Sequence, residues 1–242
     1  MFKIGIRGKG LENLHFLTYK TLKHKKMKSV TLTEQIYNYI VDRFAPDETL
    51  LTELIAETEK LEIPLIQISR DQAKFMYLTA KMINASNVLE IGTLTGFSGI
   101  HIARGLNEGG KLVTVELEKK HADFAAKYFE KAGLKDKVEI MNMPALDAMK
   151  KLVSENKKFD LIFIDADKTS YPDYYENAIN LSHKGTVIIL DNMLKSGRVV
   201  EDAGDDADLK AIQHTNDLIS KDGRTESILM TIGDGFTLSV VK

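Results

Sequence analysis

Residues Phe159–Lys168 read FDLIFIDADK, and we expect this stretch to decide the fold. An apolar run without polar alternation is typical of a strand that is covered on both faces, as in a parallel sheet. The run ends in Asp165, Asp167 and Lys168. Open α/β sheets bind their ligands beyond the carboxyl ends of the strands. Two carboxylates and an amine therefore stand where such a fold does its chemistry.

A second stretch, Thr186–Asn192, reads TVIILDN and repeats the pattern, because its apolar run ends in Asp191 and Asn192. Together with Asp165, these side chains offer hard oxygen ligands that suit Mg²⁺, Ca²⁺ or Mn²⁺. An acid at a strand end also often caps the next helix, and an Asp-Asn pair often forms a turn. Their convergence at one edge of the sheet favours a metal site over both alternatives.

Strands and helices alternate along the chain from Asn87. We expect strands near residues 88–91, 111–115, 138–141, 159–164 and 186–190. We expect helices near residues 98–106, 119–132, 146–154, 174–181 and 209–220. The alternation predicts an α/β fold with a doubly wound, mostly parallel sheet and right-handed crossovers. Two apolar runs around Gly233-Asp234-Gly235 predict a C-terminal antiparallel hairpin.

The N-terminal part of the chain divides into a basic segment and a helical one. Basic residues far outnumber the single acid, Glu12, in residues 1–29, which we interpret as a mobile basic tail. A natural start at Met27 and a role at an anionic surface stay open as alternatives. Residues 30–242 are expected to form one domain. Within it, 30–86 supply helices, the first with Thr31 and Glu34 at capping-box spacing, and 87–242 supply the sheet.

The composition excludes several classes of protein. Apolar residues make up 43% and charged residues 28% of the 242 positions, as in globular proteins. The formal net charge of −2 gives no support for extended nucleic-acid binding. The absence of cysteine excludes disulfides, thiolate metal sites and cysteine nucleophiles. Because we find neither a stretch of ~20 apolar residues nor a secretory signal, we expect a cytoplasmic protein without a membrane partner.

A glycine-containing turn follows the first predicted strand, in the stretch Leu89–Ser98, which reads LEIGTLTGFS. Dinucleotide folds use G-x-G-x-x-G to cradle a pyrophosphate, whereas Gly92 and Gly96 are spaced too widely for that motif. Glu90 would repel a diphosphate and suits a cationic ligand such as S-adenosylmethionine, which carries no phosphate. Glu116 ends the second strand, where an acid binds ribose hydroxyls. The alternative is a structural turn with two surface acids.

Lys168 is a candidate general base. A lone lysine is most often a solvated surface residue. Beside a bound dication its ammonium form is disfavoured, which would allow it to accept a proton. The six histidines show no metal-ligand spacing, and we interpret them as surface or core residues. Tyr171, Tyr174 and Tyr175 are expected to pack on the face of a helix.

Taken together, these residues resemble the cation-dependent O-methyltransferases, the family of caffeoyl-CoA and catechol O-methyltransferases. The resemblance runs from about Ser69 to the C-terminus. It rests on SRDQAKF, INASNVLEIGTLTGFS, FDLIFIDADK with Tyr171 shortly after it, LDN, and GDGFTL. It implies a Rossmann-like S-adenosylmethionine-dependent methyltransferase fold. The loop after Asn192 lacks the aromatic residue common in plant relatives, which argues against a coenzyme A ester as acceptor.

The resemblance also implies a role for individual residues. Asp165, Asp191 and Asn192 match the metal ligands, and Lys168 matches the catalytic lysine. Ser196, together with Asp165, matches the substrate side. The cofactor-binding positions correspond to Ile68, Glu90, Gly92, Thr93, Ser98, Glu116, Ala145 and Asp167.

The implied activity is methyl transfer from S-adenosylmethionine to a hydroxyl of a small catechol-like acceptor, with S-adenosylhomocysteine as product. The resemblance further implies a divalent cation, Mg²⁺ first and Mn²⁺ or Ca²⁺ as alternatives, and a homodimer. Other functions stay open: a metal-independent methyltransferase acting on RNA, protein or another small molecule, an oxidoreductase, and a non-catalytic binding module. The missing G-x-G-x-x-G motif argues against the oxidoreductase, and the near-neutral charge argues against RNA.

Overall fold

The computed structural model describes residues 30–242, so the predictions for residues 1–29 lie outside it. The chain divides between Asn38 and Tyr39 into two units, of which the second, Tyr39–Lys242, holds most of the described residues. The division falls within helix α2 (Glu34–Phe44). The hydroxyl of Thr33 accepts a hydrogen bond from the amide of Ile36 at 3.3 Å, so Thr33 caps this helix and the predicted cap at Thr31 is wrong.

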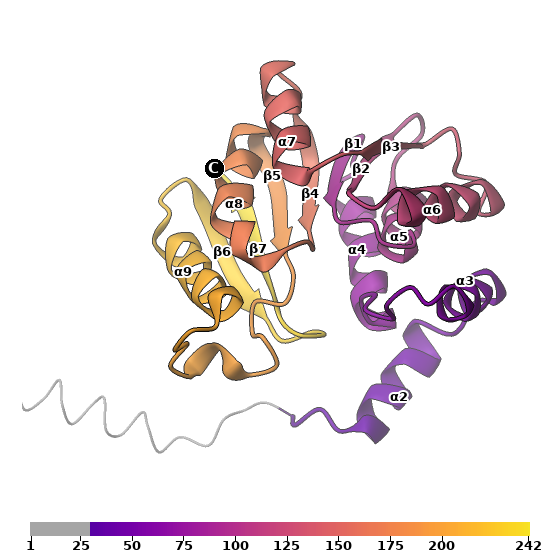
Figure 1. The fold of residues 1–242 in the computed structure, drawn as a ribbon, viewed down its shortest axis with the longest axis horizontal. Helices are drawn as coiled ribbons and strands as arrows, with labels where there is room; N and C mark the ends of the chain where they lie inside the picture. Colours follow the sequence, from indigo (N-terminus) through magenta and orange to yellow (C-terminus); the bar gives the residue numbers. More distant parts are fainter. Residues whose placement is uncertain (1–29) are drawn as a thin grey trace, which may run out of the picture. The chain divides into compact units, whose positions relative to one another are not determined.

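The second unit is built on one seven-stranded sheet with the strand order β3-β2-β1-β4-β5-β7-β6 (Figure 1). The strands are β1 (Asn87–Ile91), β2 (Lys111–Glu116), β3 (Val138–Asn142), β4 (Phe159–Ile164), β5 (Ser182–Leu190), β6 (Thr225–Met230) and β7 (Phe236–Val241). Strands β1 to β5 are parallel to one another. Strand β7 pairs antiparallel with both β5 and β6. The predicted parallel sheet and its antiparallel C-terminal hairpin are confirmed.

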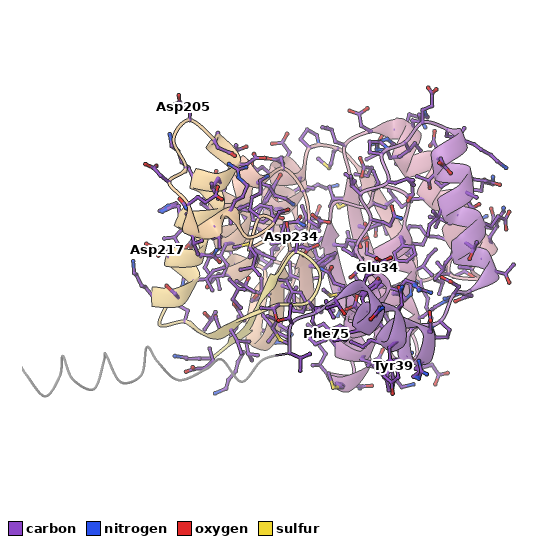
Figure 2. The ribbon with its side chains drawn as sticks, turned by 90° about the horizontal axis from the view of Figure 1, so that it is seen from below. Glu34, Tyr39, Phe75, Asp205, Asp217 and Asp234 are labelled. Atoms are coloured by element: carbon purple, nitrogen blue, oxygen red, sulfur yellow. The ribbon has the colours of Figure 1, made fainter. Side chains whose placement is uncertain are left out.

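Helices cover both faces of this sheet. They are α3 (Thr49–Lys60), α4 (Arg70–Met82), α5 (Phe97–Gly105), α6 (Lys119–Lys131), α7 (Ala145–Ser154), α8 (Tyr171–Asn180) and α9 (Ala207–Lys221), with short 3-10 turns η1 (Lys168–Ser170) and η2 (Arg198–Val200). One buried core joins α3 to α6 with one face of the strands, and a second joins α7, α8 and α9 with the other face. Phe75 of α4, labelled in Figure 2, packs on Phe236 of β7 with ring centroids 5.0 Å apart.

Two elements begin earlier than the sequence predicts. Strand β5 begins at Ser182, four residues before the predicted Thr186, because Ser182 pairs with Phe159 across a register shift in β4. The polar, exposed residues that follow Ser182 hide this pairing in the sequence pattern. Helix α8 begins at Tyr171, where Pro172 occupies its first turn, a position that proline favours.

The strand order brings the predicted site residues together. Ile91 of β1 pairs with Ile164 of β4, and Ile164 pairs with Leu190 of β5. The next residue of each strand therefore lies at the same carboxyl edge. Backbone hydrogen bonds continue across it, from the amide of Asp165 to Ile91 at 2.8 Å and from the amide of Asp191 to Ile164 at 3.0 Å.

Within residues 30–242, none of the helices combines the length and the apolar character needed to cross a bilayer.

Candidate active site

A cleft of about 960 Å³ opens at the carboxyl edge of the sheet. Its walls come from the turn after β1, the ends of β2 and β4, the start of α7, the loop after β5 and the β6–β7 turn. The predicted site residues that line it are Ile68, Gly92, Thr93, Ser98, Glu116, Ala145, Asp165, Asp167, Lys168, Asn192 and Ser196. The other two, Glu90 and Asp191, are buried behind its walls.

The turn after β1 needs glycine at Gly92. This residue has φ +95°, a conformation that L side chains rarely adopt. A Cβ atom here would also overlap the backbone carbonyl oxygen of Asp165, at the end of the neighbouring strand. The glycine thus lets the cofactor turn and the predicted metal ligand lie against each other.

Glu90 is enclosed by the protein's own hydroxyl groups. Its side chain has no exposed surface, and its carboxylate accepts hydrogen bonds from Ser98 Oγ and Thr114 Oγ1, both at 2.6 Å. Burial raises the pKa of Glu90 to about 7. The sequence analysis treats Glu90 as an anion next to a cationic ligand, whereas the structure places a partly protonated carboxyl one layer behind the cleft.

Glu116 holds a fixed position in the cleft wall at the end of β2. Its Oε2 accepts a hydrogen bond from the amide of Leu94 at 2.8 Å, and its Oε1 accepts one from the amide of Glu118 at 2.9 Å. Nδ1 of His121 lies 3.6 Å from Oε1. His121 also lines the cleft, which the sequence analysis missed. The signal available was its place in the first turn of α6, five residues after the acid, since histidine spacing alone says nothing about a ribose site.

Lys168 is held by two groups at the end of β4. Its Nζ donates to Asp165 Oδ1 at 2.7 Å and to the hydroxyl of Tyr171 at 2.7 Å. Tyr171 is completely buried, and burial together with the nearby charges of Asp165 and Asp191 raises its pKa well above the usual value. Tyr171 is therefore a neutral hydroxyl that fixes the ammonium group. The sequence places Tyr171 shortly after a stretch that carries the resemblance, but it predicts only packing on a helix face for this side chain.

Asp191 and Asp165 form a crowded pair of carboxylates. Asp191 is 2% exposed, and its Oδ1 accepts a hydrogen bond from the amide of Asn192 at 2.7 Å. Burial, followed by the negative charge of Asp165, raises the pKa of Asp191 to about 7. Gln72 of α4 lies beside Asp191, and its side-chain amide opposes the rise in the pKa of that carboxyl. Asp165 and Asp191 therefore repel each other, and the nearby positive charge is that of Lys168.

The candidate metal ligands do not form a cluster of three ionisable side chains. Among the described residues, no three His, Cys, Asp or Glu side chains are grouped so that they could hold a metal. The predicted ligand set contains two such residues, Asp165 and Asp191, and its third member is the carboxamide of Asn192. The set is therefore two carboxylates and one amide oxygen.

The loop after β5 adds residues that the sequence analysis did not single out. Lys195 lines the cleft and its Nζ lies 3.0 Å from Asp208 Oδ2. The amide of Ser196 donates to Asp234 Oδ1 at 2.5 Å, and Figure 2 shows Asp234 in the turn between β6 and β7. These contacts join segments about 13 and 38 positions apart in the chain. The Asp-Gly signal predicts the hairpin turn but carries no information about which loop the turn contacts.

The fold and this cleft define a Rossmann-like α/β protein with its cleft at the carboxyl edge of the sheet, where such folds bind their ligands. A glycine turn and Glu116 form one side, and a carboxylate pair with a fixed lysine forms the other.

Comparisons with known proteins identify the family. The model of the O-methyltransferase family matches residues 41–242, so the chain belongs to this family. A catechol O-methyltransferase from Niastella koreensis is 35% identical over 215 residues, covering 86% of this chain and 97% of the relative. One from Mycobacterium tuberculosis is 39% identical over 201 residues, covering 81% and 90%. The predicted family and the O-methyltransferase activity are confirmed.

A solved structure supports the fold. The O-methyltransferase from Bacillus cereus in complex with SAH superposes with a TM-score of 0.81 at 38% identity, covering 86% of this chain and 97% of that one. The predicted Rossmann-like methyltransferase fold is confirmed.

Proposed function

We propose that this protein is a divalent-metal-dependent O-methyltransferase that transfers a methyl group from S-adenosylmethionine to a small acceptor with vicinal hydroxyls. The observation that carries the proposal is that Asp165 and Lys168 line the cleft with the buried Asp191 next to Asp165, and that the backbone of Asp165 lies against the glycine turn. Two relatives bear the name catechol O-methyltransferase, and a similar structure contains SAH.

The cofactor side of the cleft suits S-adenosylmethionine, which would supply an already activated methyl group. Glu116 is fixed by two backbone amides, so its carboxylate is oriented to accept hydrogen bonds from ribose hydroxyls. The turn from Gly92 to Ser98 lets the ligand approach the backbone closely. Ala145 at the start of α7 and Asp167 after β4 complete this wall.

The acceptor side suits a divalent cation. Asp165 and Asp191 are close enough for the charge of one to oppose ionisation of the other, and a cation between them would relieve that repulsion. Carboxylate and amide oxygens, including that of Asn192, are the donors that Mg²⁺ and similar hard cations prefer. When bound, the cation would lower the pKa of an acceptor hydroxyl.

Lys168 is the group that would take the proton. A cation bound beside it would disfavour its ammonium form, and the neutral amine, held next to Asp165 and Tyr171 at the cleft wall, could then receive the hydroxyl proton of an acceptor. The acceptor oxygen then bonds to the methyl carbon as the bond from sulfur breaks, which leaves S-adenosylhomocysteine. The protein contributes placement and electrostatics. The implied homodimer stays a prediction.

The test is the variant Asp191→Asn, with Asp173→Asn on α8 as the control acid outside the cleft. We expect Asp191→Asn to lower turnover of catechol with Mg²⁺ by at least ~1,000-fold, because the cation loses a charged ligand. Its affinity for S-adenosylhomocysteine, measured by calorimetry, should stay within about threefold, because Asp191 lies on the other side of the cleft.

The outcome also separates the alternatives. Wild-type turnover that survives an excess of EDTA would contradict the metal role and favour a metal-independent methyltransferase. A wild-type protein that does not bind S-adenosylhomocysteine would contradict the cofactor assignment itself.

A further inference from the structure

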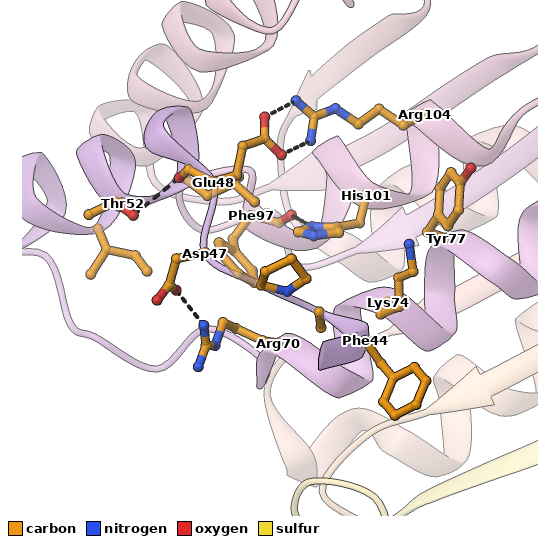
Figure 3. A pocket seen from close by; sticks show the side chains of 14 residues that line it. Phe44, Asp47, Glu48, Thr52, Arg70, Lys74, Tyr77, Phe97, His101 and Arg104 are labelled. Atoms are coloured by element: carbon orange, nitrogen blue, oxygen red, sulfur yellow. Dashed lines mark hydrogen bonds and ion pairs between the residues drawn. The ribbon is translucent and has the colours of Figure 1, made fainter. Parts of the chain in front are cut away.

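A second cavity, of about 570 Å³, lies between the start of α3 and helices α4 and α5 (Figure 3). Its size is within the range of small-molecule sites. Its walls combine apolar side chains, such as Leu51 and Ile55, with the rings of Tyr77, Phe97 and His101. Phe97 also lines the cofactor cleft, so the two cavities share one wall but are otherwise built from different residues. Arg70 and Lys74 belong to the SRDQAKF stretch of the resemblance, but the proposed activity assigns no role to this cavity.

Both acids in the cavity are neutralised by arginines. Glu48 accepts two hydrogen bonds from the guanidinium of Arg104, at 2.7 and 2.6 Å. Asp47 pairs with Arg70 at 2.6 Å. Figure 3 shows these two pairs on the rim of the same space. Arg70 also lies 3.6 Å from Asp42, so each arginine that lines the cavity has at least one acidic partner.

Lys74 lines the cavity and forms no ion pair with the described residues. Its Nζ lies 4.7 Å from the centre of the Tyr77 ring. Figure 3 shows the amine on the side of the cavity where Tyr77 and His101 lie. An ammonium group in a partly enclosed, aromatic-walled space attracts an anion more strongly than one in open water.

His101 supplies a second polar group with a fixed role. Its Nδ1 lies 2.9 Å from the carbonyl oxygen of Phe97, and a carbonyl can only accept, so Nδ1 carries the proton. Burial lowers the pKa of His101 and outweighs the opposing effect of the hydrogen bond to Phe97, so the ring is neutral. The other nitrogen, Nε2, is then an acceptor that suits a hydroxyl donor.

We propose that this cavity binds a small aromatic carboxylate that carries a hydroxyl group. The carboxylate pairs with Lys74, the hydroxyl donates to His101, and the ring packs between the aromatic and aliphatic walls. We favour an anionic ligand because the amine of Lys74 has no ion pair among the described residues. A neutral or cationic ligand would leave it without a counter-ion. This site is separate from the proposed methyl-transfer site and does not depend on it.

The test uses 4-hydroxyphenylacetate, whose single hydroxyl lacks the vicinal oxygens of a catechol acceptor. The probe is titrated by calorimetry into the full chain saturated with S-adenosylhomocysteine. We expect one saturable site, at least ~10-fold weaker binding to Lys74→Ala, and an equal loss when the uncharged amide of the probe replaces the acid. The control is Lys81→Ala, about two turns further along α4, where the amine lies 5.7 Å from the same Tyr77 ring but outside the cavity.

The amide of the probe should bind wild type and Lys74→Ala equally. It cannot form the ion pair with Lys74, so removing Lys74 causes no further loss. Thermal unfolding checks that both lysine variants are folded. Absence of saturable binding up to about 10 mM, or binding that Lys74→Ala leaves unchanged, would overturn the proposal.

Discussion

The two sides of the main cleft differ in how their acids are balanced. On the cofactor side, Glu90 is bound by two hydroxyls and Glu116 by two backbone amides. On the acceptor side, Asp165 has Lys168, while Asp191 is buried next to Asp165 and has its pKa raised. The first side is complete within the chain. The second contains a buried acid, Asp191, whose ionisation is opposed by the charge of Asp165, and the proposed cation would relieve that repulsion.

The difference matters because the two sides meet at one point. Gly92 of the cofactor turn lies against the backbone carbonyl of Asp165, the first acid of the acceptor side. A change at this contact should disturb both sides, whereas a change inside either side should disturb only that one.

The largest effect is expected from Gly92→Ala. The new Cβ would overlap the Asp165 carbonyl oxygen, and the residue would keep a left-handed conformation that alanine disfavours. Together these should lower the free energy of unfolding by about 3–5 kcal/mol, the sum of overpacking and backbone strain. Denaturant unfolding measures the loss. Affinity for S-adenosylhomocysteine and turnover should both fall.

Gly185→Ala is the matched control, because Gly185 has φ +89° but no atom within 4 Å of an added Cβ. Its cost should be only the backbone strain, about 1 kcal/mol. Equal losses for the two variants would show that the contact with Asp165 has no part in the effect.

A smaller effect is expected from Glu90→Gln, and it should depend on pH. In the unfolded chain Glu90 loses its proton near the ordinary pKa of 4.5, while in the folded protein it keeps the proton up to about pH 7. A raised folded-state pKa means that stability from this group is full below the unfolded pKa and falls as the pH rises through the folded pKa. Glu90→Gln should remove about 2–3 kcal/mol of that decline.

The measurement is the free energy of unfolding from pH 4.5 to 7.5 for wild type, Glu90→Gln and Glu139→Gln, the last at an exposed position of β3. Asp191 has its pKa raised into the same range, so some decline should persist in every variant. If Glu90→Gln followed the wild-type curve, Glu90 would not be the buried, late-ionising acid that the structure describes.

Sequence patterns predicted the parts of this molecule that follow from local chemistry. Continuous apolar runs predicted the buried strands, and the strand ends predicted the edge at which Asp165 and Asp191 meet, because parallel strands share that edge. The Asp-Gly turn predicted the terminal hairpin. Glycine at Gly92 was expected from the turn, although its contact with the next strand was not.

Contacts between distant segments were beyond the reach of those patterns. The full burial of Glu90 depends on Thr114, which lies on another strand, and the position of Ser196 depends on Asp234 in the last hairpin. The cavity around Lys74 needs α3, α4 and α5 in their packed arrangement. A lysine in a helix and a histidine in the next helix carry no sequence signal of their meeting.

The smallest of the three effects is expected from Tyr171→Phe, which changes only the acceptor side. The variant removes the hydroxyl that accepts a hydrogen bond from Lys168 at 2.7 Å and keeps the ring over which the amine lies. Because Lys168 still has Asp165, we expect kcat to fall about tenfold, equivalent to about 1.4 kcal/mol, with little change in affinity for S-adenosylhomocysteine. The control is Tyr175→Phe on the same helix, whose hydroxyl binds Asp222 at 2.9 Å, far along the chain from Lys168. Tyr175→Phe should lower thermal stability and leave kcat unchanged. If Tyr171→Phe also lowered only stability, the hydroxyl would serve packing alone, and Asp165 would hold the lysine by itself.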